Sequence, residues 1–413
     1  MVNISCVDYF APFAELIHEI YSCSDSGFDE YPIKIDDNLR KISIEKYLRD
    51  MINKPDGTLD ANDFKGIKIL FLEKKGITDI KGIELCSDLE DLELFGNYVQ
   101  DISPLSALKN LKILDLDFNS IEDLKPIELL TNLEILNLQC TNIHDVQYLS
   151  KLRNIRILIL DENPISDLSP LSELTSLEML KLCDTRVKDL EPISKLINLR
   201  RLDASGYFSP YIKHMNYEIP DISALRNLTN LEYLNLSYNK ISDIRPLICL
   251  NKLKELKLDE NIITDISPIA SMDSLEVLTI RHNGLSNIEP LKNLKNIKKL
   301  SLSRNDIIII EPLSDLYSLE ELDLWSNKIE NISHLAKLRN IRYINLFSNN
   351  INTLKEYIND IGANYCGKLK IDITYNPIDE KELEIEVKEL EKKGIIVISD
   401  LSHVSLEEAI KYP

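Results

Sequence analysis

Apolar residues recur along most of the chain with a spacing of 22 residues. In the stretch LKILDLDFNSIEDLKPIELL, which begins at Leu111, leucine or isoleucine follows at offsets 3, 5, 10, 13, 16 and 19. The same residue classes return from Leu133 onward, so the register starts again after 22 positions. A period in this range is typical of a solenoid, in which each unit buries its apolar face against its neighbours.

The first apolar residue of each unit, called position 0 below, can be followed through the chain. The units start at Ile67, Leu89, Leu111, Leu133, Ile155, Leu177, Leu199, Leu231, Leu253, Leu275, Ile297, Leu319, Ile341 and, in degenerate form, Lys368. All steps are 22 residues except the step of 32 that follows Leu199 and the step of 27 that follows Ile341. We therefore predict about 14 repeats, with insertions at these two places.

Each position within a repeat has its own expected role. Alternation predicts one short strand from +2 to +6, with +3 and +5 facing inward and +2, +4, +6 and +7 facing outward. Asparagine occupies +8 in ten repeats, where its amide can satisfy backbone groups as the chain leaves the strand. Proline occupies +15 in eight repeats, commonly after aspartate at +12, which favours a short 3-10 turn.

The ends of such an array need covering, because a bare terminal repeat would expose apolar side chains and an edge strand. Helical spacing is weak over Phe10–Ile20 and clearer over Leu39–Ile52. Near the other end, Asp379 is placed to cap a helix that Gly394 ends, and a closing strand follows at 395–399. We predict an N-terminal helical cap (1–66), repeats (67–376, with an insertion at about 206–219), and a C-terminal helix–strand cap with a tail (377–413).

Composition excludes several classes of partner and location. Lys and Arg number 48 against 68 Asp and Glu, and the net charge of −20 argues against nucleic acid or an anionic membrane as the main partner. No run reaches the roughly 18 apolar residues of a spanning helix, so we expect no membrane insertion. Seven cysteines without paired spacing favour reduced thiols, and the chain start lacks the basic region of a signal peptide. We expect a monomer in the cytoplasm; the alternative is a secreted or surface-exposed protein whose leader the given sequence lacks.

Signatures of catalysis are absent from the sequence. It contains no GxGxxG, Walker, GxSxG or HExxH motif, and 11 glycines leave little room for phosphate cradles. Asp115, Asp117 and Asp161 do not have the spacing of a calcium loop. We therefore expect a protein that is not an enzyme, with no cofactor and no metal.

The repeat consensus carries a family resemblance. The pattern LxxLxLxxNxIxDIxPL, found in LEDLELFGNYVQDISPL and LEYLNLSYNKISDIRPL, resembles the 22-residue leucine-rich repeat of the bacterial internalins. Eukaryotic regulators of protein phosphatase share this repeat subtype. The resemblance covers roughly residues 40–395 and implies an α/β solenoid, a leucine-rich repeat horseshoe with a parallel concave sheet and short 3-10 turns on its convex side.

For function, the resemblance implies a non-enzymatic protein–protein interaction module that binds a protein partner on its concave face. The alternative is a cytoplasmic regulatory subunit of an enzyme such as a protein phosphatase. Fold alone does not choose between them.

Outward positions that folding leaves free are the candidate binding residues. They fall into an acidic N-terminal arm, a more basic middle and an aromatic C-terminal arm, and aromatic side chains dominate interface hot spots. The alternatives are lateral packing for the aromatic residues, a solvated face for the acidic ones and a tolerated surface loop for the insertion. The predicted partner-binding residues are Trp325, Phe347, Tyr343, Tyr375, Tyr233, Tyr238, Arg281, Arg304, Asp115, Asp117 and, in the insertion, Tyr207, Phe208 and Tyr211.

Overall fold

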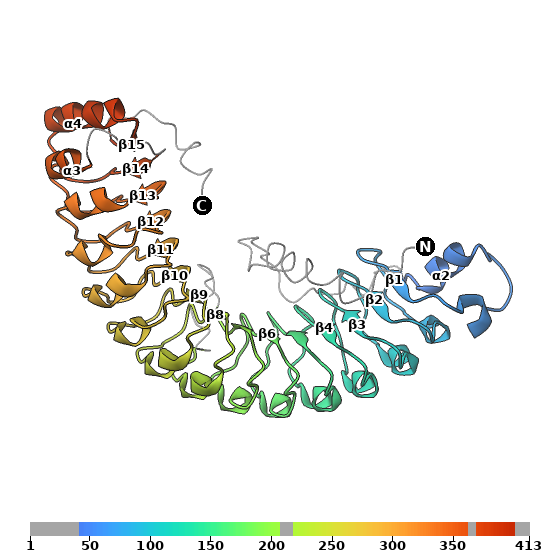
Figure 1. Ribbon diagram of the computed structural model, residues 1–413. Coiled ribbons are helices and arrows are strands. Elements are labelled where there is room, and N and C mark those ends of the chain that lie inside the picture. The colour runs from blue at the N-terminus through green and yellow to red at the C-terminus, as the bar shows by residue number, and fades with distance from the viewer. Residues whose placement is uncertain (1–40, 207–217, 362–368, 401–413) are drawn as a thin grey trace. The chain divides into compact units, whose positions relative to one another are not determined.

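The computed structural model describes residues 41–206, 218–361 and 369–400. The chain divides into two units, 1–40 and 41–413, and the description concerns the second. Within the described residues, fifteen parallel strands form one sheet, and their order in the sheet is their order in the sequence. The strands line the inner side of the curved array and the turns its outer side (Figure 1). The predicted leucine-rich repeat solenoid with an open parallel sheet is confirmed.

Every strand is three residues long and occupies positions +2 to +4 of its repeat. The strands are β1 (Ile69–Phe71), β2 (Asp91–Glu93), β3 (Ile113–Asp115), β4 (Ile135–Asn137), β5 (Ile157–Ile159), β6 (Met179–Lys181), β7 (Arg201–Asp203), β8 (Tyr233–Asn235), β9 (Glu255–Lys257), β10 (Val277–Thr279), β11 (Lys299–Ser301), β12 (Glu321–Asp323), β13 (Tyr343–Asn345), β14 (Lys370–Asp372) and β15 (Ile396–Ile398). They are shorter than predicted, but hydrogen bonds between repeats continue to +7, where the Phe118 N–H donates to the Gln139 carbonyl.

The convex side is built from 3-10 turns. They span Ala61–Phe64 in the N-terminal cap and then Ile83–Leu85, Ser103–Ala107, Lys125–Leu129, Gln147–Lys151, Ser169–Leu171, Glu191–Ile193, Ser223–Asn227, Arg245–Cys249, Ser267–Ile269, Glu289–Asn293, Glu311–Leu313 and Ser333–Lys337. The aspartate at +12 caps the turn that follows. In the third repeat the carboxylate of Asp123 accepts a hydrogen bond of 2.8 Å from the Lys125 N–H, the first residue of its turn.

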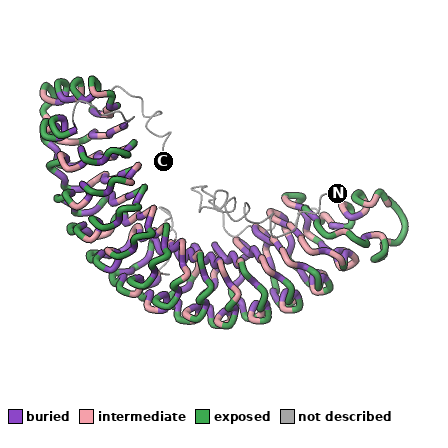
Figure 2. The backbone as a smooth tube through the Cα atoms, in the orientation of Figure 1, coloured by how far each residue is buried: buried purple, intermediate pink, exposed green. Residues whose placement is uncertain are grey.

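Leucine and isoleucine fill the interior between sheet and turns. Leu111, Leu114 and Leu116 are fully buried, and the corresponding residues of the neighbouring repeats are buried beside them. The buried positions follow the coil through every repeat (Figure 2). Full burial of one such side chain stabilises the fold by about 2 kcal/mol relative to exposure. Stacking, rather than any single repeat, therefore holds the array together.

The asparagines at +8 form a buried ladder. The Asn119 amide donates to the carbonyls of Leu94, Leu116 and Asp117, and its oxygen accepts from the Val99 N–H. These bonds join one repeat to the preceding one and satisfy carbonyls where the chain turns. Where the preceding residue, at +7, is not glycine, its φ lies between 46° and 58°, in the left-handed region.

Helices cover both ends of the described array. Helix α2 (Glu45–Ile52) buries Leu48 and ends at Asn53, whose φ of 54° is left-handed. Helix α4 (Glu380–Lys392) is capped by Asp379, as predicted, and β15 closes the sheet. The repeat that starts at Ile341 is five residues longer than the others, and it forms the short helix α3 (Lys355–Asp360) where the other repeats have a 3-10 turn. The helix expected over 10–20 lies outside the described residues.

The insertion starts at a glycine that the stack requires. A Cβ added to Gly206 would lie 2.1 Å from the backbone oxygen of Tyr238, closer than any side chain permits. Tyr207, Phe208 and Tyr211 lie outside the described residues, so their predicted contacts stay predictions. Among the helices of the described ranges, none has the length and apolar character to cross a membrane.

Candidate protein-binding surface

The register of the sheet brings equal positions of successive repeats side by side. Glu321 pairs with Tyr343 and Asp323 with Asn345, and this pattern holds along the whole sheet. Outward side chains therefore form columns that cross the strands, about 4.8 Å apart. A partner lying along the concave face would contact neighbouring columns over several repeats.

Three aromatic rings contact one another across successive repeats and are called the aromatic ladder below: Trp325 and Phe347 at +6 and Tyr375 at +7. Trp325 meets Phe347 edge to face with ring centroids 6.1 Å apart, and Phe347 lies 4.9 Å from Tyr375. Tyr375 is 69 % exposed, whereas the other two rings are half-buried. Large rings packed against one another need little further ordering when a partner binds, which favours an interface hot spot.

The other predicted residue of this arm, Tyr343, stands on β13 at +2. It is half-buried, and burial together with the charges of Asp372 and Asp323 raises the pKa of its phenol to about 12. Its hydroxyl therefore stays protonated at neutral pH and remains a hydrogen-bond donor.

Cations adjoin the aromatic ladder on the side of the middle repeats. The Arg304 guanidinium lies 6.0 Å from the Trp325 ring centroid and 3.6 Å from Glu260, which also contacts His282. Arg281 is exposed and donates to the Ser303 hydroxyl at 3.1 Å. Both predicted arginines are therefore accessible and held in place, as a recognition surface requires. Tyr238 is 37 % exposed, at the left-handed +7 position beside Gly206.

Two predicted contact residues are buried. Tyr233 is 8 % exposed, with the Arg201 guanidinium 4.4 Å and the Lys257 ammonium 5.5 Å from its ring. Asp117 is fully buried. Tyr233, at +2 on β8, is covered by these two cations, whereas Asp117, at +6, lies buried between neighbouring repeats. Neither side chain is therefore open to a partner.

The acidic arm is not a simple solvated face. Burial raises the pKa of Asp117 to about 9, with the charge of Asp115 adding to the effect. Burial also raises the pKa of Asp115 and of Asp91 to about 6. Asp161, two repeats further along the chain, is buried too, but it forms an ion pair of 2.8 Å with Lys181. The concave face thus contains buried carboxylates with and without a counter-charge.

A charge ladder on the flank of the solenoid was missed by the sequence reasoning. At +1 the sign of the charge alternates through thirteen successive repeats: Lys68, Glu90, Lys112, Glu134, Arg156, Glu178, Arg200, Glu232, Lys254, Glu276, Lys298, Glu320 and Arg342. Ion pairs follow it, for example Arg156 with Glu178 at 2.7 Å and Lys254 with Glu232 at 3.0 Å. The alternation is visible in the sequence once position +1 is aligned, so it could have been found.

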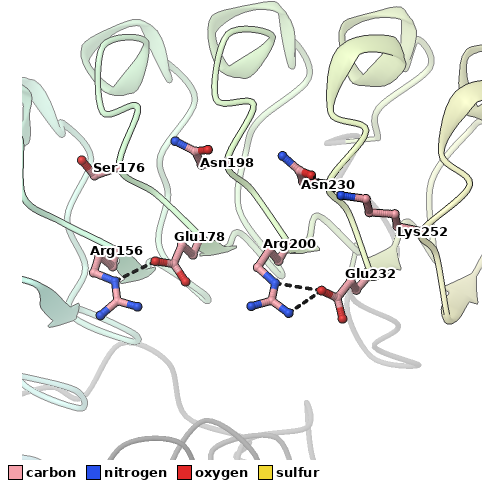
Figure 3. A pocket seen from close by; sticks show the side chains of 8 residues that line it. All are labelled: Arg156, Ser176, Glu178, Asn198, Arg200, Asn230, Glu232 and Lys252. Carbon is pink, nitrogen blue, oxygen red and sulfur yellow. Dashed lines mark hydrogen bonds and ion pairs between the residues drawn. The ribbon is translucent and has the colours of Figure 1, made fainter. Parts of the chain in front are cut away.

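The middle of this charge ladder borders a shallow groove of about 690 Å³. Figure 3 shows Arg156 reaching to Glu178 and Arg200 to Glu232, with Asn198 and Asn230, which come two residues before Arg200 and Glu232, higher in the view. These asparagines, at position −1, donate to backbone carbonyls of the preceding repeat, Thr175 and Ile197. Every charged side chain that lines the groove already has a hydrogen-bond or ion-pair partner. We therefore interpret the groove as part of the scaffold.

Reversing one charge of the ladder tests this structural role. Glu178→Lys would leave three cations in a row, and we expect the free energy of unfolding to fall by about 1 kcal/mol because like charges on neighbouring strands repel. Urea denaturation measures the change, and about 0.5 M NaCl should shrink it by screening. Glu178→Gln is the matched control, with a smaller loss. A salt-insensitive loss would contradict the electrostatic cause.

Comparison with known proteins gives the following matches. A family model described as Leucine Rich repeats (2 copies) matches residues 87–129 and 229–271. The crystal structure of an internalin (inlF) from Listeria monocytogenes is 33 % identical, with a TM-score of 0.73, over 79 % of this chain and 93 % of that one. No curated protein sequence gives a significant match.

Two further solved structures share the fold. A leucine-rich repeat protein of Leptospira interrogans is 23 % identical with a TM-score of 0.63, over 86 % of this chain and 100 % of that one. A plant peptide hormone receptor, solved in complex with RGF2, is 20 % identical with a TM-score of 0.58, over 75 % of this chain and 59 % of that one.

Proposed function

Because the chain belongs to the internalin-like family of bacterial leucine-rich repeat proteins, we propose that it captures a protein partner on the concave face of its sheet, through the aromatic ladder. The leucine-rich repeat fold is a scaffold for protein–protein interaction, and the proteins matched are typically interaction modules without catalysis.

The single observation that carries the proposal is the contact of Trp325, Phe347 and Tyr375 across three successive repeats. Burying such rings in a partner recovers apolar area at low entropic cost, and the Arg304 and Arg281 side chains beside them supply directional polar contacts. In the plant peptide hormone receptor, which was solved in complex with RGF2, the same fold is used by a receptor for peptide hormones.

Removing two rings of the aromatic ladder tests the site. We expect the double variant Trp325→Ala, Phe347→Ala to bind its partner about thirty-fold more weakly, a loss of about 2 kcal/mol, because truncation of a hot spot removes both contact area and preorganisation. Affinity capture from native lysate, followed by titration of the captured protein, measures the change. The thermal unfolding midpoint should hardly move, since neither ring belongs to the leucine core.

The matched control is Tyr317→Ala. Tyr317 is also an aromatic residue, 54 % exposed, but it follows the Glu311–Leu313 turn on the outer side. Its removal should leave capture unchanged. If the double variant and wild type capture the same protein with equal affinity, the aromatic ladder is not the binding site. The sequence-based alternative, a regulatory subunit, stays a prediction that co-purification of an enzyme activity would favour.

A further inference from the structure

We propose that the first three repeats hold a second binding site on the same face, a carboxylate cluster that receives a lysine- or arginine-rich segment of the protein partner. The cluster comprises the partly exposed Glu73, Asp91, Glu93 and Asp115, which a partner can contact, and the fully buried Asp117 next to them, which it does not contact directly. The inference rests on the proposed function in that it takes the ligand to be a protein lying along the concave sheet.

The fold forces these carboxylates together. Glu93 on β2 and Asp115 on β3 are directly paired in the sheet register, so two acidic side chains of the same column stand on adjacent strands. Like charges placed opposite each other destabilise a sheet. Burial raises the pKa of Glu93 to about 8, and the neighbouring carboxyl of Glu73, in the turn after β1, adds to the rise. Carboxyl groups that raise one another's pKa in this way form a site short of positive charge.

An independent observation points to a missing cation. Asp117 is fully buried, and neither of its carboxylate oxygens has a well-formed hydrogen bond to the described part of the chain. The nearby Phe118 N–H donates to the Gln139 carbonyl, and its effect on the pKa of Asp117 is too small to offset burial. One carboxylate oxygen of Asp91 is likewise buried without a hydrogen-bond partner among the described residues. A buried carboxylate without a partner is costly, and proteins normally pair such a group or keep it protonated. Asp117 also borders the cluster directly, because its own N–H donates to Asp115 at 2.8 Å.

The rest of the concave face shows what the cluster lacks. Asp161 has Lys181 at 2.8 Å, Glu321 has Lys299 at 3.0 Å, and Glu260 has Arg304 at 3.6 Å. Across the described residues, no ion pair reaches any of the five carboxylates of the cluster. The described part of the chain therefore supplies counter-charges to these three carboxylates and none to the cluster, where five carboxyl groups lie together and a partner can supply them.

Apolar side chains at the cluster suit the stems of long cationic residues. Ile69 and Phe71 on β1 are each 54 % exposed, and Phe95 meets Phe118 edge to face at 5.7 Å. Lysine and arginine bury aliphatic stems while their charged ends reach acidic groups, and aromatic faces attract them. The Lys74 ammonium already lies 4.8 Å from the Phe95 ring centroid.

A metal ion fits the cluster less well than a partner's side chains. Among the described residues, no group of three or more acidic, histidine or cysteine side chains is arranged to hold a metal. The carboxylates are spread over three successive repeats, on β2 and β3 and in the turns after β1 and β3. This arrangement matches several cationic side chains of an extended segment. Arginine is the better fit, because its planar fork can bridge two carboxylates.

Binding at this site should depend on pH. The charged and titratable groups that face it are Glu73 and Lys74 after β1, Asp91 and Glu93 on β2, Asp115 and Asp117 at β3, and Asp161 and Glu162 after β5, with the neutral Asn137 donating to Asp115. Because the pKa values of Asp91 and Asp115 are about 6, both lose their charge in mild acid. Binding of a cation should therefore strengthen as the pH rises and the carboxyl groups ionise.

The test uses a fluorescently labelled hexa-arginine peptide and the full chain, with a hexa-citrulline peptide as the uncharged ligand of the same shape. We expect the triple variant Asp91→Asn, Glu93→Gln, Asp115→Asn to bind hexa-arginine at least tenfold more weakly than wild type. The matched control is Glu122→Gln, Glu330→Gln, Glu389→Gln, three exposed carboxylates away from the concave strands. Both variants change the net charge from −20 to −17, since −20 + 3 = −17.

The outcomes separate the site from general charge attraction. Less than twofold weakening in the matched control supports the cluster, whereas equal weakening in both triple variants overturns it. Wild-type affinity should rise at least fivefold from about pH 5.5 to about pH 8.5, while arginine stays charged throughout; a flat pH profile also overturns the proposal. The aromatic double variant should bind hexa-arginine like wild type, so failure of the aromatic ladder and failure of the cluster give different results.

Discussion

Replacing Asn261 with alanine is expected to lower the free energy of unfolding by about 3–4 kcal/mol, at about 1 kcal/mol for each hydrogen bond lost from a buried site. The Asn261 amide donates to the carbonyls of Leu236, Leu258 and Asp259, and its oxygen accepts from the Ile241 N–H. Alanine would leave these backbone groups buried and unsatisfied between two repeats. Urea denaturation followed by circular dichroism measures the loss.

Two controls isolate the buried position. Asn296→Ala removes an asparagine at position −1 that is exposed and makes one bond, to the Asp273 carbonyl, so its cost should stay below about 1 kcal/mol. Asn261→Thr should lose less than alanine, because at the same position Thr141 keeps a hydroxyl bond to the Leu138 carbonyl. Equal losses of unfolding free energy for Asn261→Ala and Asn296→Ala would show that the buried asparagines do not stabilise the fold more than exposed ones.

Neutralising Asp117 is expected to stabilise the protein, and more so as the pH rises. The folded pKa of about 9 lies above the ordinary value, so the folded state holds a proton that the unfolded chain releases above about pH 4. Stability attributable to this group is therefore lost as the pH increases. Between about pH 5 and about pH 8, wild type should lose about 3 kcal/mol more than Asp117→Asn.

Asp161→Asn is the matched control. Burial raises the pKa of Asp161 only to about 6, because the charge of Lys181 offsets part of the effect, so at about pH 8 the carboxylate is ionised and its loss has the opposite sign. Asp161 occupies the same +6 column and is buried as well, but it pairs with Lys181, which is 7 % exposed, and accepts the Cys183 N–H. Its neutralisation should destabilise the protein by about 3 kcal/mol at pH 8 because a buried ammonium loses its partner. Denaturation series at both pH values decide the matter, and a destabilised Asp117→Asn would contradict the account of an unpaired carboxyl.

The repeat starts, the inward positions and the helix that Asp379 caps were predictable because each depends on side chains close together in the sequence. The burial of side chains at position +6 could not be predicted in this way. Strand alternation treats Asp117 and Trp325 alike, but the regular strand ends at +4 and the left-handed residue at +7 turns the chain away. Beyond the strand, side-chain size decides the exposure, so the small Ser303 is buried and Trp325 is half-buried.

The candidate site divides in the same way. Its aromatic ladder was predictable, since position alone brings Trp325 and Phe347 into adjacent repeats. The carboxylate cluster was visible only as an acidic arm, because missing counter-charges can be recognised only when the neighbours of Asp91 and Asp117 are known in space. Helix α3 depended on how five extra residues fold, which the period itself does not specify.

The alternating charges at +1 limit how such an array can grow. Deleting one repeat, for example by joining the repeat of Glu134 to that of Glu178, would place two anions on neighbouring strands, and inserting one would do the same elsewhere. Deleting or duplicating two consecutive repeats restores the order of signs. The unit of safe expansion in this chain is therefore a pair of repeats, and gene duplications that change its length by pairs would conserve the flank while moving the carboxylate cluster and the aromatic ladder closer together or further apart along the face.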